Sequence, residues 1–229
     1  MKIAIIPARF GSKRIKKKNI KLFYSKPMIV WTLKKLTESN FFDKIVVTSD
    51  SKKILNISKN NGADILIHRP KKLSGDIVGT LPVITHALKQ LKKYNYNKSY
   101  VCCVYPCNPF LNFKDVKNGF LKLKKNLTKF IFPVTEYSHP IQRALKLNAN
   151  NHAIPFLKTN SNKRTQDLEK TYFDAGQFYW GTSNLWHENN SLHKSGMCIP
   201  IPSWRVVDID NLSDWKRAEV LFKNFFIKA

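Results

Sequence analysis

Short apolar runs alternate along this chain with longer stretches whose apolar residues recur every three or four positions. The first run, Ile3–Ile6, ends at Pro7 and predicts a buried strand. Ile29, Leu33 and Leu36 then share one face of a helix that Pro27 can open. Continued alternation of this kind predicts βαβ units, in which a largely parallel sheet carries helices on its faces.

The same pattern extends to the end of the chain. We expect further strands at 44–49, 64–67, 100–105, 130–135, 176–181 and 206–209, and helices at 52–61, 81–94, from 114 onward and at 214–226. The alternation lapses between about 136 and 173, where short extended pieces at 144–147 and 153–156 and a short helix at 163–170 are expected among polar loops. We therefore predict one α/β domain over residues 1–229, with an insertion at about 136–173.

Composition adds a strong positive charge. The 229 residues are 43% hydrophobic, enough for one buried core, and 40 basic against 15 acidic residues give a formal charge of +25. Such a charge usually indicates a nucleic-acid or anionic partner. The lysines are nevertheless spread over nearly every segment, including the helix faces, so we expect no nucleic-acid partner and keep a basic RNA-binding protein as a minor alternative.

Two further features concern location and cysteine chemistry. The apolar run precedes the basic cluster, the reverse of a signal peptide, and no stretch reaches 18 apolar residues, so we expect a cytoplasmic protein without a membrane partner.

The cysteines are expected to be free thiols. Cys102 and Cys103 are adjacent in a predicted strand and would point to opposite faces. Cys107 and Cys198 lack metal-ligand spacing, so we predict free thiols, with no disulfide and no structural metal.

The first strand is followed by a strongly basic loop. Open α/β sheets bind ligands at the carboxyl ends of their strands, which is where this loop begins. Arg9, Lys13 and Lys18 offer charged donors, Ser12 offers a hydroxyl, and Gly11 would let the backbone approach a ligand. The spacing is neither a Walker A loop nor a dinucleotide fingerprint. A solvated basic turn is the alternative, but the position favours a triphosphate site.

Near the other end of the chain, Asp208 and Asp210 form a candidate metal site. Alternate residues of a strand share a face, so both carboxylates would point the same way while Ile209 enters the core. Mg²⁺ takes one or two protein carboxylates together with substrate phosphates. In the alternative, Asp210 or Asn211 simply caps the last helix. The predicted triphosphate loop favours the metal.

Together these two sites suit a nucleotidyl transfer. Loop cations would offset the charge that builds on departing pyrophosphate, and a hydroxyl would attack the α-phosphorus in line. The sequence has no G-x-S-x-G elbow and no convincing Cys/His dyad, in agreement with direct displacement. We expect catalysis to be carried by Arg9, Lys13, Lys18, Asp208 and Asp210.

The basic loop also resembles a known signature. Ile6–Asn19 is similar to the IPARxGSKxIxxKN motif of the cytidylyltransferases that activate nonulosonic acids, the CMP-sialic acid synthetase family. The resemblance implies a Rossmann-like nucleotide-diphospho-sugar transferase (GT-A-like) domain, with a mixed, mostly parallel sheet, a dimerisation insertion and a homodimer. It also implies CTP contacts by Ala8, Arg9, Gly11, Ser12, Lys13 and Asn19.

Two later segments extend the resemblance. The stretch from Arg69 to Thr80 is similar to the family's RPxxLxxD loop, which implies that Arg69 and Thr80 read cytosine. In the alternative, Arg69 is an ordinary surface cation. Tyr105–Phe110 is similar to the [QY]PTxPL segment that borders the acceptor sugar.

The stretch from Arg164 to Trp180 resembles RSQDLxxxYHDAGQFYWG, a signature of the branch that acts on pseudaminic acid. It implies transfer of CMP from CTP to pseudaminic acid, with release of pyrophosphate and Mg²⁺ as cofactor, for surface glycan or flagellin glycosylation. Sialic or legionaminic acid is the alternative acceptor. Candidate sugar contacts are Tyr105, Arg143, Arg164, Gln166, Asp174 and Gln177, and the arginines could instead cross a subunit boundary. Some aromatic residues of this stretch are expected in the core.

The chain departs from the family pattern at three positions. Phe10 replaces a glycine without removing a phosphate donor, and Lys16 replaces a proline. Phe173 replaces a histidine, which removes a group suited to acid–base chemistry or sugar contact.

Overall fold

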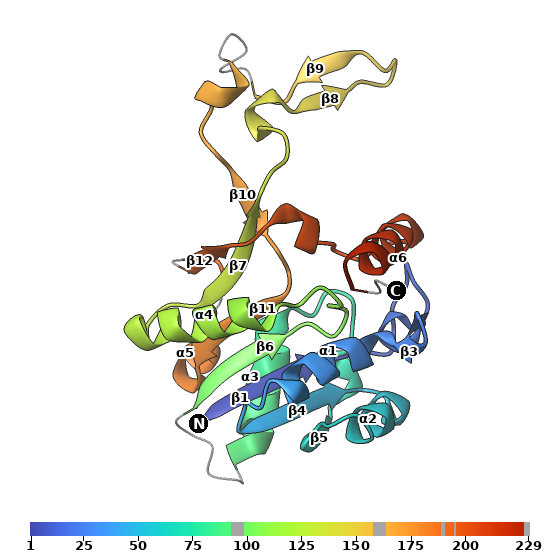
Figure 1. Ribbon diagram of the computed structural model, residues 1–229, viewed down its shortest axis with the longest axis vertical. Helices are drawn as coiled ribbons and strands as arrows, with labels where there is room; N and C mark the ends of the chain where they lie inside the picture. The colour runs from blue at the N-terminus through green and yellow to red at the C-terminus, as the bar shows by residue number, and fades with distance from the viewer. Residues whose placement is uncertain (93–98, 158–163, 189–190, 195, 227–229) are drawn as a thin grey trace.

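The computed structural model describes residues 1–92, 99–157, 164–188, 191–194 and 196–226, and its centre is a twisted sheet (Figure 1). In spatial order the strands are β10 (Tyr172–Asp174), β7 (Ile131–Glu136), β11 (Phe178–Thr182), β6 (Tyr100–Val104), β1 (Lys2–Pro7), β4 (Lys44–Ser49) and β5 (Ile65–His68), and β12 (Met197–Pro200) pairs with β7. Strands β5, β4, β1 and β6 are parallel, and β11 runs antiparallel between β6 and β7. The predicted α/β class with a mixed, mostly parallel sheet is confirmed.

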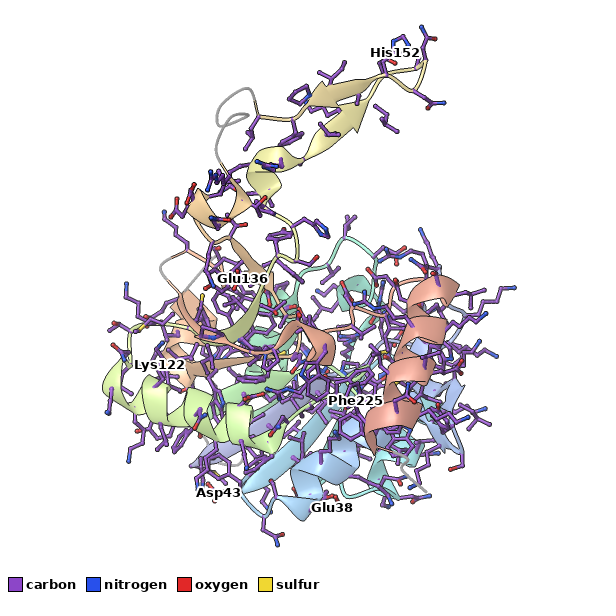
Figure 2. The ribbon with its side chains drawn as sticks, turned by 45° about the horizontal axis from the view of Figure 1, so that its top comes forward. Glu38, Asp43, Lys122, Glu136, His152 and Phe225 are labelled. Carbon is purple, nitrogen blue, oxygen red and sulfur yellow. The ribbon has the colours of Figure 1, made fainter. Side chains whose placement is uncertain are left out.

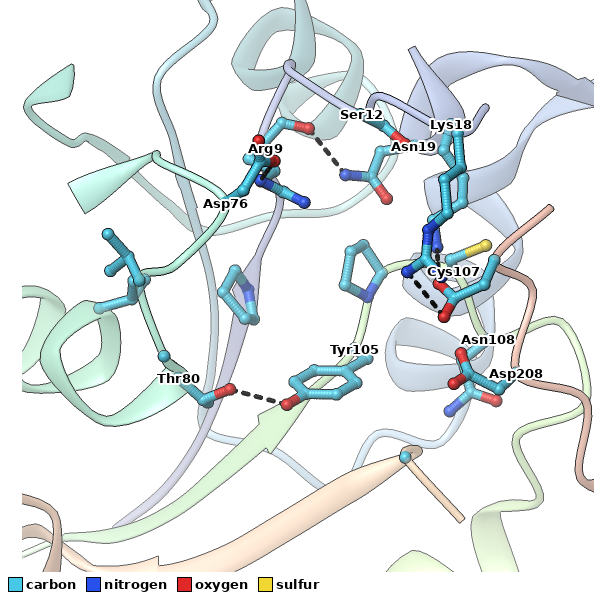
Figure 3. A pocket seen from close by; sticks show the side chains of 18 of the residues that line it. Arg9, Ser12, Lys18, Asn19, Asp76, Thr80, Tyr105, Cys107, Asn108 and Asp208 are labelled. Atoms are coloured by element: carbon cyan, nitrogen blue, oxygen red, sulfur yellow. Dashed lines mark hydrogen bonds and ion pairs between the residues drawn. The ribbon is translucent and has the colours of Figure 1, made fainter. Parts of the chain in front are cut away.

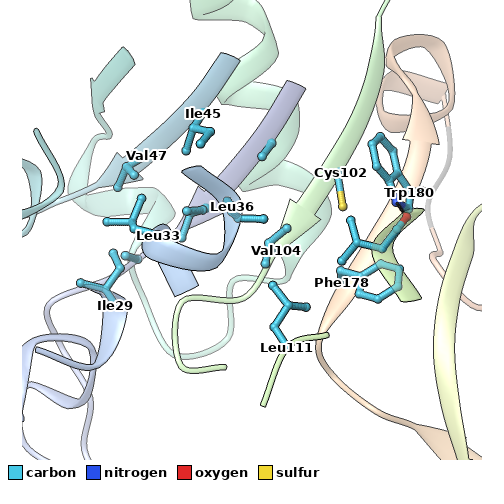
Figure 4. Packing of buried hydrophobic residues seen from close by; sticks show 14 of the residues in the cluster. Ile29, Leu33, Leu36, Ile45, Val47, Cys102, Val104, Leu111, Phe178 and Trp180 are labelled. Atoms are coloured by element: carbon cyan, nitrogen blue, oxygen red, sulfur yellow. Dashed lines mark hydrogen bonds between the residues drawn. The ribbon is translucent and has the colours of Figure 1, made fainter. Parts of the chain in front are cut away.

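Helices cover both faces of the sheet. Apolar residues of α1 (Met28–Glu38), α2 (Lys52–Lys59) and α4 (Phe113–Lys125) pack in one cluster, and those of α3 (Thr80–Leu91) and α5 (Ser183–Glu188) pack in another. Figure 4 shows the first cluster, where Leu33 and Leu36 of α1 lie over strand residues such as Val104. Cys102 and Cys103 enter opposite clusters as free thiols, as strand alternation requires.

A third cluster joins the two ends of the chain. Helix α6 (Leu212–Phe226) packs Trp215 and Phe222 against Phe23 of the small β2 (Leu22–Phe23) and β3 (Lys26–Pro27) hairpin. The same cluster buries Ile15 and Ile209, which are 2% and 1% exposed. Burial of these two isoleucines beneath one helix brings the basic loop and the Asp208–Asp210 segment together.

An arm projects from the body between β7 and β10 (Figure 1). It holds the hairpin of β8 (Leu145–Leu147) and β9 (Ala153–Pro155) and the single turns η4 (Ile141–Arg143) and η5 (Thr165–Asp167). Figure 2 shows Glu136 at its base and His152 at its tip. Every residue of β8 and β9 is exposed. The hairpin therefore adds nothing to the core of its own chain.

The structure differs from the expected elements in several places. Residues 206–209, all within the described part, form an extended loop after η6 (Ser203–Arg205), and not a strand. The helix expected at 163–170 is the single turn η5, and the expected end of the helix at 81–94 lies outside the described residues. Strand β12 and helix α5 were not predicted, because each is short. No helix in the described part of the chain is long and apolar enough to cross a membrane.

Candidate active site

A cleft of about 570 Å³ opens at the carboxyl ends of the parallel strands. Pro7 ends β1, while Arg69 and Tyr105 directly follow β5 and β6, and all three line the cleft. Parallel strands end at the same edge of a sheet, so loops far apart in sequence meet there. Eleven of the residues expected from the sequence line this one cleft, namely Arg9, Ser12, Lys13, Lys18, Asn19, Arg69, Thr80, Tyr105, Gln177, Asp208 and Asp210.

Two hydrogen bonds join the basic loop to the end of β4, and a third lies within the loop. The Ala8 amide donates to the carbonyl of Thr48 at 2.9 Å, and the Phe10 amide donates to Asp50 Oδ1 at 2.8 Å. Asn19 Nδ2 donates to the carbonyl of Arg9 at 2.8 Å, and Asn19 is only 6% exposed. The loop is therefore held in shape without a ligand, and Asn19 both lines the cleft and positions Arg9.

Two carboxylates pair with four cations of this loop. Figure 3 shows Arg9 beside Asp76 on one side of the cleft and Lys18 on the other. Asp76 accepts from Arg9 Nη1 at 2.5 Å and from Lys13 Nζ at 2.7 Å. These two cations hold the pKa of Asp76 below its ordinary value. Asp210 pairs with Arg14 at 2.8 Å and with Lys18 Nζ at 3.3 Å. A polyphosphate bound to these cations would have to compete with the carboxylates or displace them.

Asp208 and Asp210 both line the cleft, while Ile209 between them is buried. The side chains thus alternate as expected, although the segment is an extended loop. Helix α6 is capped by Asn211, whose Oδ1 accepts from the Asp214 amide at 3.0 Å, while Asp214 Oδ2 accepts from the Asn211 amide at 2.9 Å. Because Asn211 supplies the cap, the side chain of Asp210 stays directed to Arg14 and Lys18.

The donor set fits a magnesium ion that also takes phosphate oxygens. Burial, together with the nearby carboxylate of Asp210, raises the pKa of Asp208. Among the described residues no three His, Cys, Asp or Glu side chains are grouped to hold a metal. Mg²⁺ ordinarily needs only one or two protein carboxylates when substrate phosphates and water complete its six ligands. Asp208 and Asp210 therefore suffice if a polyphosphate lies beside them.

Arg69 and Thr80 line the cleft, and Figure 3 shows Thr80 on the side opposite Asp208. Arg69 is 3% exposed and its Nε donates to Ser74 Oγ at 3.0 Å, so it is not the surface cation of the alternative interpretation. Burial lowers the pKa of Arg69, against the opposing influence of Asp50. Thr80 Oγ1 and the Tyr105 hydroxyl are hydrogen-bonded at 2.7 Å.

Gln177 lines the cleft and carries a buried side-chain oxygen that has no partner among the described residues. The residue is 3% exposed, and its Nε2 donates to the carbonyl of Arg205 at 2.8 Å. Arg205 is itself held by Asp115 at 2.5 Å. Gln177 Oε1 has no hydrogen-bond partner among the described residues. Because a buried amide oxygen without a donor is costly, this atom is suited to accept from a ligand.

Asp174 lies behind the wall rather than on it. Its Oδ1 accepts from the Gly176 amide at 2.8 Å, and its Oδ2 accepts from Tyr179 and from His193 Nε2, both at 2.6 Å. Phe173, which takes the place of the family's histidine, packs on Tyr137 with ring centroids 4.8 Å apart.

Comparison with known proteins identifies the family. A family model described as Cytidylyltransferase matches residues 3–195. The chain belongs to the cytidylyltransferase family. It is 39% identical to the pseudaminic acid cytidylyltransferase of Campylobacter jejuni over 96% of both chains. It is 25% identical to the CMP-N,N'-diacetyllegionaminic acid synthase of Legionella pneumophila, again over 96% of both.

Solved structures agree on the fold. A CMP:2-keto-3-deoxy-manno-octonic acid synthetase complexed with CTP superposes with a TM-score of 0.71 at 12% identity, covering 97% of this chain and 98% of the other. A 2-C-methyl-D-erythritol 4-phosphate cytidylyltransferase of Francisella tularensis superposes with a TM-score of 0.63 at 14% identity, covering 96% and 99%. These likenesses confirm the nucleotidyltransferase fold with its Rossmann-like sheet.

Besides Asp174, five expected site residues of this cytidylyltransferase do not line the cleft of their own chain. Ala8 is buried and contributes its backbone, and a Cβ at Gly11 would meet nothing within 4 Å, so neither role in CTP binding is tested. Arg143, Arg164 and Gln166 lie on the arm, where all three are exposed. Their proposed sugar contacts stay predictions.

The cleft of the cytidylyltransferase also contains residues that the sequence analysis did not assign. Arg14, Asp76 and Asn108 are among them. Arg14 stands inside the basic string and could have been included with it. Asp76 is one of only 15 acids and lies inside the stretch from Arg69 to Thr80 that was predicted to bind the nucleotide, which was a usable signal. Nothing in the sequence indicated that Asn108 Nδ2 would donate to the carbonyl of Gln177, at 3.3 Å.

Proposed function

We propose that the chain transfers CMP from CTP to the anomeric hydroxyl of pseudaminic acid and releases pyrophosphate. The observation that carries this proposal is that the amino-terminal cations and the carboxylates of Asp208 and Asp210 line one cleft, with Lys18 Nζ 3.3 Å from Asp210 Oδ1. A triphosphate is the ligand that needs both kinds of group. The 39% identity to a pseudaminic acid cytidylyltransferase supports the choice of acceptor.

Different residues of the cleft bind different parts of the nucleotide and its metal. Arg9, Lys13 and Lys18 bind the triphosphate and offset the charge on the leaving pyrophosphate. Arg69 and Thr80 contact cytosine. Asp208 and Asp210 hold Mg²⁺, which supplies charge stabilisation on the phosphate oxygens when bound.

The acceptor sugar lies toward Tyr105 and Gln177 in this proposal. Gln177 Oε1 accepts a hydrogen bond from an acylamino or hydroxyl group of the sugar, which satisfies the unpaired oxygen. Asn108 supports the same wall through its bond to the Gln177 carbonyl. The sugar hydroxyl then attacks the α-phosphorus directly, so no covalent enzyme intermediate forms.

We also propose a homodimer formed through the arm. An isolated two-stranded hairpin is marginal in water, and here Leu145, Leu147 and Ile154 are 63%, 67% and 48% exposed. A second copy that covers these side chains would stabilise the hairpin and exclude water from them. Arg143, Arg164 and Gln166 would then reach a cleft of the partner. The cytoplasmic location expected from the sequence stays a prediction.

The direct test of function is pyrophosphate release. The purified protein should release pyrophosphate from CTP with pseudaminic acid and Mg²⁺, more slowly with UTP, and not after chelation of the metal. Higher turnover with sialic or legionaminic acid than with pseudaminic acid would replace the acceptor and keep the reaction. No release with any nonulosonic acid, together with salt-sensitive RNA binding, would overturn the enzyme in favour of the RNA-binding alternative.

A further inference from the structure

Both side-chain oxygens of Asp210 are paired with cations from the other end of the chain. Oδ2 pairs with Arg14 Nη2 at 2.8 Å, and Oδ1 lies 3.3 Å from Lys18 Nζ. Asp208, the other carboxylate of the proposed metal site, has no ion pair within the part of the chain that the structure describes. A divalent cation that enters the cleft therefore meets one open carboxylate and one that is already paired.

The backbone on both sides of this contact is fixed by burial. Ile15, next to Arg14, is 2% exposed, and Ile209, next to Asp210, is 1% exposed. Both isoleucines pack in the cluster beneath α6. The fold itself therefore places Arg14 beside Asp210.

The two cations differ in how firmly they are held. Lys18 is 20% exposed, and its Nζ also donates to the carbonyl of Ile209 at 2.5 Å. Arg14 is 66% exposed, and its one ion pair among the described residues is with Asp210. An exposed pair of this kind is favoured only by about 5-fold or less. Arg14 is therefore the cation that can exchange the carboxylate for a stronger anion.

A polyphosphate would offer Arg14 such an anion. Arg14 lines the same cleft as Arg9 and Lys13, and a guanidinium group binds phosphate oxygens through two parallel N–H donors. When Arg14 turns to the phosphate, Asp210 Oδ2 becomes free. Both carboxylates are then available to Mg²⁺, which takes protein carboxylates and phosphate oxygens together.

We propose that Arg14 is a positioning residue that keeps Asp210 from the divalent cation until a nucleoside triphosphate is bound. The inference rests on the proposed function, because it assumes a metal site at Asp208 and Asp210. Since linkage between two ligands is reciprocal, Arg14 increases the factor by which the triphosphate and the metal strengthen each other's binding. The family motif leaves position 14 open and assigns it no role.

The first experiment measures Mn²⁺ binding to the nucleotide-free protein, from the loss of the electron paramagnetic resonance signal of free Mn²⁺. Arg14→Met should bind Mn²⁺ about 3- to 5-fold more tightly than the wild-type protein, because Asp210 Oδ2 is left open. Arg14→Lys keeps a cation beside Asp210 and should bind Mn²⁺ like the wild-type protein. A merely structural role of Arg14 would weaken metal binding on substitution, so the sign of the change separates the two roles.

Lys16→Met is the matched control for charge. Lys16 is an exposed cation of the same loop and has no ion pair with Asp210 among the described residues. Its substitution lowers the net charge by the same amount, but salt screens an exposed charge that makes no direct contact. Mn²⁺ affinity should therefore stay close to the wild-type value. Equal gains in Arg14→Met and Lys16→Met would overturn the inference, because they would reflect net charge alone.

The second experiment compares the dissociation constant of CTP with and without Mn²⁺, by calorimetry and without an acceptor sugar. The ratio of the two constants should be about 3-fold smaller in Arg14→Met than in the wild-type protein, and unchanged in Arg14→Lys. The complex of Mn²⁺ with free CTP is the same for every variant and cancels from the comparison. An unchanged ratio in Arg14→Met would overturn the inference.

The outcomes separate this inference from the proposed function. A wild-type protein that binds no Mn²⁺ even with CTP would overturn the proposed metal site and the role of Arg14 with it. Mn²⁺ binding by the wild-type complex, without a gain in nucleotide-free Arg14→Met, would overturn the role of Arg14 alone. Because Arg14 is 66% exposed, we expect its variants to fold, and thermal unfolding checks this. Arg14→Gln is a second neutral variant that should give the same gain as Arg14→Met.

Discussion

The cleft and the arm are built in opposite ways. The cleft collects residues from five segments of the chain and holds them over buried clusters, with Ile15 and Ile209 both packed beneath α6. The arm keeps Leu145 and Leu147 more than 60% exposed and places Arg143 and Arg164 away from the cleft. The predicted nucleotide contacts that line the cleft all come from one chain, whereas a role of the arm at a cleft belongs to the proposed homodimer.

The largest expected effect comes from the carboxylate nearest the cations. Asp210→Asn should lower kcat by at least about 100-fold, since a lost metal ligand removes several kcal/mol of charge stabilisation. The fold should be kept, because Asn211 and Asp214 cap α6 without the Asp210 side chain. Steady-state pyrophosphate release measures kcat, and thermal unfolding measures whether the fold is kept.

Asp43→Asn is the matched control for this change. Asp43 accepts from the Lys2 amide at 2.6 Å, far from the cleft, and asparagine can still accept there. The Asp43→Asn variant should therefore release pyrophosphate at the wild-type rate. A near-normal rate in Asp210→Asn would remove the metal assignment.

Lys18→Met should have the next largest effect. Lys18 Nζ donates to the carbonyl of Ile209 at 2.5 Å and pairs with Asp210, so it links the two ends of the chain at the cleft. Loss of a charged donor should lower kcat/KM for CTP by about 10- to 100-fold. Lys16→Met, two residues earlier and exposed, is the control. Equal values of kcat/KM for CTP in Lys18→Met and Lys16→Met would contradict a role of the Lys18 side chain in the cleft.

A smaller effect is expected from the arm. Leu145→Asp combined with Leu147→Asp should place two charges in the proposed dimer contact and yield a monomer of 26.6 kDa by light scattering. CTP binding should persist while turnover falls by about 10-fold, if arm residues serve the partner's cleft. Leu121→Asp, on the exposed face of α4, is the control. A wild-type protein that is already monomeric and active would contradict the proposed role of the arm.

The smallest effect concerns Asp76. Its carboxylate neutralises Arg9 and Lys13 and would compete with phosphate, so Asp76→Asn should lower KM for CTP by about 2- to 3-fold. Salt should shrink the difference, because these side chains are partly exposed. Since the two cations lower the pKa of Asp76, the carboxylate stays ionised near neutral pH and the effect should not vary there. A loss of activity above 10-fold would instead give Asp76 a direct role.

Much of the fold followed from local pattern. The parallel core and its helices were predictable because apolar periodicity is strong where an element is buried on one face, as in α1 and β1. The segment 206–209 shows the limit of this reasoning. Its side chains alternate as a strand's would, but it pairs with no strand in the part of the chain that the structure describes, and pairing is a tertiary property.

The candidate site was predictable to the same extent. The cations and carboxylates were recognisable because few residue types bind phosphate or Mg²⁺, and the structure places them in one cleft. Asp174 and Arg164 were not separable by sequence, although one lies behind the cleft wall and the other on the arm. The contact of His193 with Asp174 was also beyond prediction, since the two residues are 19 positions apart and meet only in the folded chain.

The most direct test is a crystal structure of the protein with CTP and Mn²⁺, in which anomalous scattering marks the metal. We predict the metal at the carboxylates of Asp208 and Asp210, with the triphosphate of the same nucleotide contacting Arg9, Lys13 or Lys18. A metal bound elsewhere, or a triphosphate that contacts only one of these two groups, would contradict the proposal that both ends of the chain hold one polyphosphate.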